Sequence, residues 1–167
     1  MMKKFLFILF ALTLCLFAVN LRQPKVAAST SIEGDLVSTT TEVYDDGSYL
    51  VTEYYVLKEN SKTRSNSYNV THTKTVTYTS TNDKVLWTYR LYGTFAIVEG
   101  VSCVATSSSY EYTLGSSQWH FSNGSSYCSG NQVFGLGTFK HKLLGITTKT
   151  MNIDIHIECD TYGNKVA

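Results

Sequence analysis

The sequence has a single proline, Pro24, and only 16% of its 167 residues carry a charge. Proline cannot donate a hydrogen bond to a β ladder, so its absence after residue 24 leaves the rest of the chain free to form strands. No segment has the sustained helical repeat of apolar residues that marks an amphipathic helix. The longest apolar run is also too short for a comfortable membrane span.

Motifs of common enzyme chemistry are absent as well. The chain has no G-x-S-x-G, no P-loop and no H-E-x-x-H. Its two most closely spaced histidines, His141 and His156, are fifteen residues apart, unlike the tight spacing of zinc ligands. We therefore predict no catalytic residue, no metal site and no cofactor. An enzyme whose acidic residues converge only in the folded chain stays open as an alternative.

The first 28 residues have the features of a secretory signal peptide. Lys3 and Lys4 precede the apolar run Phe5–Val19, and small residues for cleavage are present in Val26-Ala27-Ala28. We predict that Met1–Ala28 is removed and that the protein is secreted, either extracellular or associated with the cell wall.

Loss of the leader would change the balance of charge. Four of the 14 basic residues lie in it, which leaves ten basic against 13 acidic residues, a net charge of −3 instead of +1. Binding of nucleic acid depends on basic side chains that neutralise phosphates, and attraction to an anionic membrane depends on basic clusters. We therefore predict neither nucleic acid nor membrane as a partner after signal cleavage.

The predicted mature sequence is dominated by Thr, Ser and Tyr, which suit strands. Residues 85–98 place bulky apolar side chains, Trp87 among them, on one face, and residues 151–159 do the same, so these two faces are expected to form the core. Residues 29–35 are interpreted as a flexible lead-in. Residues 36–167 are predicted to form one all-β domain, an antiparallel Ig-like or jelly-roll-like β-sandwich of about eight to ten strands.

Local signals add detail to this prediction. Asp45-Asp46-Gly47 is typical of a hairpin turn. Gly93 interrupts an apolar face and indicates a bulge, or a corner where the strand changes sheet. Residues 107–130 are rich in Ser, Gly and Tyr and are interpreted as largely loops.

Three cysteines remain after the predicted cleavage. Alternation places Cys103 and Cys159 on inward faces of strands, and an extracytoplasmic compartment favours disulfides, so we predict a bond between them. Cys128 lies in a Ser- and Gly-rich segment and is predicted to be a free thiol in a loop. Pairing of Cys128 with either of the others stays open.

A series of short motifs extends over residues 84–164. They are Lys84-Val-Leu-Trp87, Leu91-Tyr-Gly93-Thr94-Phe95, Cys103, Trp119, Ser129-Gly130-Asn131, Gly137 with Phe139, and Cys159 followed by Gly163-Asn164. In these motifs the chain resembles a group of uncharacterised small secreted β-sandwich proteins of Gram-positive bacteria, particularly Clostridia and their relatives. The resemblance implies a compact extracellular sandwich with a disulfide, and it brings no activity or functional residue with it.

Aromatic side chains are the remaining candidates for a ligand site, because sugar rings stack on aromatic faces and the tyrosine hydroxyl tolerates water. The candidates are Tyr54, Tyr110, Tyr112, Trp119 and Tyr127. We interpret the protein as a secreted, non-enzymatic binding module whose ligand is a cell-wall or host glycan, or another protein. The alternatives are a secreted hydrolase with acidic residues that meet only in the fold, and a small antagonistic effector.

Overall fold

The computed structural model describes residues 34–57 and 66–166; the predicted leader and most of the predicted lead-in lie outside these residues. The described residues form eight antiparallel strands and no helix, which confirms the prediction of an all-β sandwich. The strands are β1 (Asp35–Val43), β2 (Tyr49–Leu57), β3 (Ser67–Thr79), β4 (Val85–Val98), β5 (Ser102–Leu114), β6 (Trp119–Ser129), β7 (Gln132–Leu143) and β8 (Ile146–Glu158).

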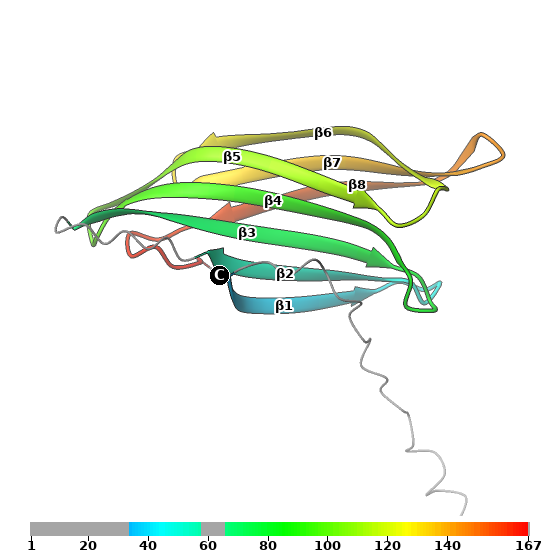
Figure 1. The fold of residues 1–167 in the computed structure, drawn as a ribbon, viewed down its shortest axis with the longest axis horizontal. Coiled ribbons are helices and arrows are strands. Elements are labelled where there is room, and N and C mark those ends of the chain that lie inside the picture. The colour runs from blue at the N-terminus through cyan, green and yellow to red at the C-terminus, as the bar shows by residue number, and fades with distance from the viewer. Residues whose placement is uncertain (1–33, 58–65, 167) are drawn as a thin grey trace, which may run out of the picture.

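The strands are divided between two sheets. The first has the order β1-β2-β3-β4-β5 and the second the order β6-β7-β8, so every hydrogen-bonded neighbour is also a neighbour in sequence (Figure 1). β7 packs against β4 and β5, and β8 packs against β3. The sandwich is therefore built from two meanders, and it lacks the Greek-key connections that Ig-like and jelly-roll sandwiches use.

The core lies where the two sheets face each other. The rings of Trp87 from β4 and Phe139 from β7 stack with centroids 4.0 Å apart, and Trp119 and Tyr78 pack around them. Met151, the first residue of the predicted inward row of β8, is also buried there. The two apolar faces expected to meet in the core, those of residues 85–98 and 151–159, are thus confirmed.

The corner between the sheets lies at Gly115, not at Gly93. Gly115 donates its amide hydrogen to the Leu86 carbonyl, and a Cβ atom there would lie 2.2 Å from the Val85 carbonyl oxygen. Gly93 stays within β4, beside a bulge in the pairing of β4 with β5. A Cβ on Gly93 would lie 2.9 Å from a methyl group of Val133, so this glycine lets the second sheet approach β4 closely.

The segment predicted to be largely loops is mostly strand. It contains most of β5 and all of β6, which are joined by a short turn. The alternation of apolar and polar residues that predicts a strand is weak here, because many of these side chains, such as Ser107, Ser122 and Ser125, are exposed and polar. Backbone pairing with β4 and β7, not a regular apolar face, defines these strands.

The C-terminal residues after β8 return across β3 and β1. The Tyr68 hydroxyl donates to the Tyr162 carbonyl at 2.7 Å, and Lys165 Nζ donates to the Ser38 hydroxyl at 3.0 Å. Between these contacts lies the fully buried His72, whose Nε2 is 3.1 Å from the Gly163 carbonyl and whose Nδ1 bonds to the Tyr54 hydroxyl. A carbonyl accepts only, so Nε2 of His72 carries a proton. Burial disfavours the charged ring, so we assign the neutral tautomer, in which Nδ1 accepts from Tyr54.

Acidification is expected to destabilise the protein through His72. Burial lowers the pKa of His72, against the opposing influence of the Gly163 carbonyl and the Asp160 charge. Because the folded pKa lies below the unfolded value of about 6.5, the contribution of neutral His72 is complete above that pH and is lost as the pH falls through the folded pKa. The unfolding free energy should therefore fall by up to about 1.4 kcal/mol per pH unit in this window.

Urea unfolding between about pH 7.5 and pH 5 measures this effect. The variant His72→Gln lacks the titrating group and should show a shallower decline over the same range. Equal pH slopes in the two proteins would contradict the assignment of His72 as a buried neutral side chain.

Candidate functional site

The outward surface of β6, β7 and β8, turned away from the five-stranded sheet, is the candidate site. Its side chains form rows that cross the three strands in register. One row is Asn123, Thr138 and Asn152; the next is Ser125, Leu136 and Asp154; the third is Tyr127, Phe134 and His156. Side chains on one face of a strand recur every two residues, so successive rows are about 7 Å apart.

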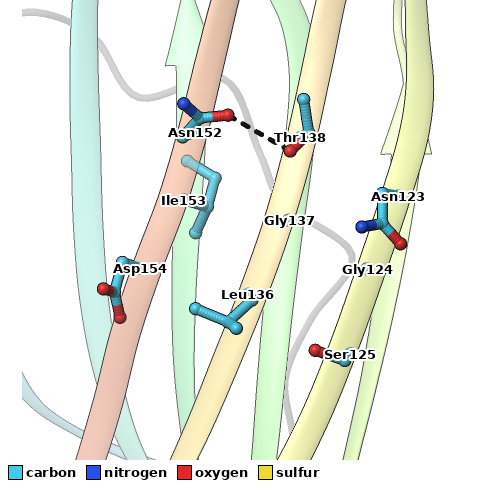
Figure 2. A pocket seen from close by; sticks show the side chains of 9 residues that line it. All are labelled: Asn123, Gly124, Ser125, Leu136, Gly137, Thr138, Asn152, Ile153 and Asp154. Atoms are coloured by element: carbon cyan, nitrogen blue, oxygen red, sulfur yellow. Dashed lines mark hydrogen bonds between the residues drawn. The ribbon is translucent and has the colours of Figure 1, made fainter.

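A trough of about 300 Å³ lies between the first two rows (Figure 2). Its floor is the paired backbone of Gly124, Gly137 and Ile153. The side chain of Ile153 is buried toward the core, and a Cβ on either glycine would also point toward core rings, so none of the three residues places a side chain in the trough. The floor is therefore bare on the outer surface. A volume of 300 Å³ is at the lower end of the range for small-molecule sites.

Gly124 and Gly137 also allow aromatic rings of the core to pack directly beneath the trough. A Cβ on Gly137 would lie 3.0 Å from the Tyr89 ring, and one on Gly124 would lie 2.4 Å from the Phe121 ring. A side chain at position 124 would thus displace the ring packed on it, and one at position 137 would leave the Tyr89 ring a very tight fit. The same two residues shape the core on one side and the trough on the other.

Polar groups line both walls of the trough. Thr138 donates from its hydroxyl to the Asn152 side-chain oxygen at 3.1 Å, which orients the Asn152 amide nitrogen as a donor. Asn123 and Ser125 stand on β6 across the floor from Asn152 and Asp154 on β8. Asp154 supplies the single carboxylate of the lining, and it is exposed. The walls therefore offer donors and acceptors together, as a ligand with several hydroxyl groups requires.

An aromatic row borders the trough. The Tyr127 and Phe134 rings stack at 5.0 Å with an interplanar angle of 12°, and His156 continues the row at 5.9 Å from Phe134. β6 is an edge strand of its three-stranded sheet, and β5 of the other sheet packs along its other side. Tyr127 is 49% exposed. This ring can accept an apolar surface of a ligand that also reaches the trough.

The five aromatic residues predicted from the sequence to bind a ligand lie in different parts of the structure. Tyr127 lies in the candidate site. Tyr54 and Trp119 are each only 3% exposed and belong to the core, because the Tyr54 hydroxyl is bonded to His72 and the Trp119 ring packs on Trp87. Tyr110 and Tyr112 lie on β5 and pack against Phe121, so they support the core beside β6. A ligand on the outer surface of the second sheet reaches only Tyr127 of this group.

Local sequence patterns do not identify the other residues of the site. Phe134 carries no local mark that separates it from a core aromatic residue, and Asn123 lies in the region interpreted as loops. Alternation along β8 places Asp154 on the outward face, but it does not distinguish a site residue from an ordinary solvated carboxylate. Only the register of β6, β7 and β8 brings these residues into neighbouring rows.

The cysteines are arranged largely as the alternation indicates. The Cys103 and Cys159 thiols lie close to each other and are not bonded covalently in this structure, and burial raises the pKa of each. Cys128 is exposed and lies near the end of β6, so its predicted position in a loop is wrong. Cys128 and His120 stand eight residues apart on this one strand, or about 26 Å, which is too far for a nucleophile–base pair.

The carboxylates of β8 do not form a hydrolytic pair. Asp154 and Glu158 are four residues apart on the extended strand, about 13 Å, whereas glycosidase carboxylates are about 5 to 9.5 Å apart. Glu158 is also engaged, since its two oxygens accept from the side chains of Gln132 at 2.8 Å and Asn131 at 3.3 Å.

A function for this chain can be argued only from the geometry of the site, because no known protein was found to match it. No protein-family model, no curated protein and no solved structure matches this chain. In residues 34–57 and 66–166, no three His, Cys, Asp or Glu side chains lie close enough to hold a metal ion. The same residues contain no helix long and apolar enough to cross a membrane.

Proposed function

We propose that the protein is a secreted, non-enzymatic module that binds a glycan on the outer surface of β6, β7 and β8. The observation that carries this proposal is the polar trough directly beside an exposed aromatic row. A sugar ring has apolar C–H faces and a polar rim of hydroxyl groups, and the site offers a partner for each.

Each part of the site has a role in this proposal. The exposed part of the Tyr127 ring packs against the C–H face of one sugar ring. Ser125 is the next outward residue on β6, about 7 Å from Tyr127, so a neighbouring ring of the same glycan would reach the trough. There Asn123, Asn152 and Asp154 hydrogen-bond to hydroxyl groups, and the carboxylate of Asp154 makes the strongest of these bonds because it is charged.

Binding without hydrolysis fits the number of carboxylates. Both mechanisms of glycoside hydrolysis need two carboxyl groups placed on either side of the scissile bond. The lining of the trough has only Asp154. We therefore propose a binding protein in preference to the hydrolase alternative. No residue of this site supports the other alternative, a small antagonistic effector.

Secretion and a disulfide complete the proposal. The signal-peptide features of Met1–Ala28 favour export, and the contact between the Cys103 and Cys159 thiols favours a bond between them. The oxidant is the disulfide of an extracytoplasmic thiol oxidoreductase. The two thiols give up two electrons and two protons to it as the Cys103–Cys159 bond forms, and the oxidoreductase becomes a dithiol. Cys128 is left as a thiol.

The melting temperature of the mature protein against a panel of sugars and soluble cell-wall fragments tests the proposed function. A ligand that binds only the folded state raises its stability by about 2.7 kcal/mol at a hundredfold excess over Kd. We expect an increase with at least one glycan, and no such increase in a variant in which Asn152→Ala and Asp154→Ala remove polar groups from the trough. Absence of any glycan effect, with binding to a secreted or surface protein instead, would contradict the proposal.

A further inference from the structure

The tip of the hairpin between β7 and β8 exposes three large aliphatic side chains in a row. Leu144 is 96% exposed, Ile146 is 70% exposed and Leu143 is 50% exposed. The hairpin extends beyond the neighbouring turns at that end of the sandwich (Figure 1, orange). Such a cluster of exposed aliphatic groups on a projecting tip indicates a contact outside the molecule.

The backbone at this tip is unfavourable for the residue that occupies it. Leu143 pairs with Ile146 across a two-residue loop in which both Leu144 (φ 50°) and Gly145 (φ 83°) have a positive φ, the signature of a type I′ turn. Asn-Gly is the preferred sequence for this turn, and a leucine pays a steric cost in the left-handed region. With 96% of its surface exposed, Leu144 gains almost no packing in return.

Neither folding nor packing therefore accounts for leucine at position 144. A backbone outlier of this kind is a reason to look for a functional contact. The composition of the hairpin indicates which contact. Residues 140–150 contain three lysines and no acidic residue, and two of these lysines, Lys140 and Lys142, lie on the stem just behind the aliphatic tip.

We propose that this tip inserts into the apolar layer of a lipid bilayer. Leu143, Leu144 and Ile146 would enter the acyl region, and the long side chains of Lys140 and Lys142 would reach back to the phosphate groups at its surface. Lys149 is excluded from this role because it is bound to Tyr78 at 2.7 Å and to Asp46 at 3.3 Å within the protein.

A bilayer fits the tip better than a second copy of the chain does. Stable protein interfaces bury about 1,200 to 2,000 Å², which three side chains on a narrow hairpin cannot supply. A fluid acyl layer accepts a convex tip without a preformed complementary pocket. The net charge of −3 expected for the mature chain opposes attraction of the whole molecule to an anionic surface, but the tip is a local exception that combines aliphatic and basic groups.

The proposed insertion is separate from glycan binding. Thr138 in the trough is six residues from Leu144, about 20 Å along the strand. A ligand in the trough therefore leaves the tip free, and failure of either proposal leaves the other standing.

Flotation with lipid vesicles tests the insertion. The probe is the chain that begins at Ser29, which has its own core and lacks the apolar leader, mixed with vesicles of phosphatidylcholine alone or with phosphatidylglycerol. The test variant is Leu144→Asn, which supplies the preferred turn residue and removes the aliphatic group. The matched control is Val101→Asn, which removes an aliphatic side chain that is 75% exposed in the turn between β4 and β5.

We expect the parent protein and Val101→Asn to float equally. Leu144→Asn should partition about tenfold or more weakly, because one leucine side chain is withdrawn from the apolar phase. Its melting temperature should be equal to or higher than that of the parent, which separates loss of binding from loss of fold. No flotation of the parent, equal partitioning of Leu144→Asn, or self-association that Leu144→Asn abolishes would overturn the proposal.

Discussion

Reduction of the oxidised protein is expected to lower its free energy of unfolding by about 4 kcal/mol, the loop-closure value for a bond between Cys103 and Cys159. Cys103 lies at the start of β5 in the first sheet, and Cys159 follows β8 in the second, so the bond would tie the two sheets together. It would also anchor the C-terminal residues that bury His72. Without the bond the unfolded chain gains freedom while the folded chain keeps its core.

Denaturant unfolding with and without a reducing agent measures this difference. Cys128→Ser should behave as the parent does, since its thiol is exposed and outside the proposed bond. Cys103→Ala should have the lower stability in both conditions and no response to the reducing agent. Identical unfolding curves for the oxidised and reduced parent, or a Cys103 that an alkylating reagent modifies in the unfolded, unreduced chain, would contradict the disulfide.

Replacement of Tyr127 by alanine is expected to weaken glycan binding about tenfold to a hundredfold. The ring supplies the apolar platform of the proposed site, and aromatic residues at the centre of an interface typically contribute about 2 kcal/mol or more. Tyr127 is on an edge strand and half exposed, so its removal should cost little stability. Isothermal titration of the variant Tyr127→Ala with the glycan that gives the largest thermal effect measures the change.

Tyr162→Ala provides the matched control for this experiment. Tyr162 is 59% exposed in the C-terminal turn, away from the three-stranded sheet, and its removal should leave the affinity unchanged. Equal affinity of Tyr127→Ala and the parent would show that the aromatic row is not part of the site. Equal losses in both tyrosine variants would indicate nonspecific adsorption to exposed rings.

The strands and the core were predictable because alternation along one chain segment determines which side chains face inward. The rows of β4 and β8 are long and regular, so Trp87 and Ile153 could be assigned to the core without knowledge of their neighbours. Neighbouring residues such as Tyr54 and Tyr55 point to opposite faces, and the strand pattern does not say which face is covered. The buried contact with His72 decides that Tyr54 points inward.

The candidate site could not be predicted in the same way, because its parts come from three strands. A bulge between Phe121 and Asn123 shifts the pairing of β6 with β7 by one residue. Side chains alternate with a period of two, so a shift of one residue moves every later side chain to the other face. Asn123, Ser125 and Tyr127 are therefore on the outer surface only with this register, and no local signal in a Ser- and Gly-rich strand specifies it.

Mapping of the ligand contact by nuclear magnetic resonance tests the central claim most directly. An isotopically labelled mature protein would be titrated with the glycan that raises its melting temperature most, and the amide signals of backbone and side chains would be followed. The account predicts changes centred on Asn123, Asn152 and Tyr127, including the side-chain amides of the two asparagines. Changes centred instead on the outer surface of the five-stranded sheet, around Arg90 and Glu111, would contradict it.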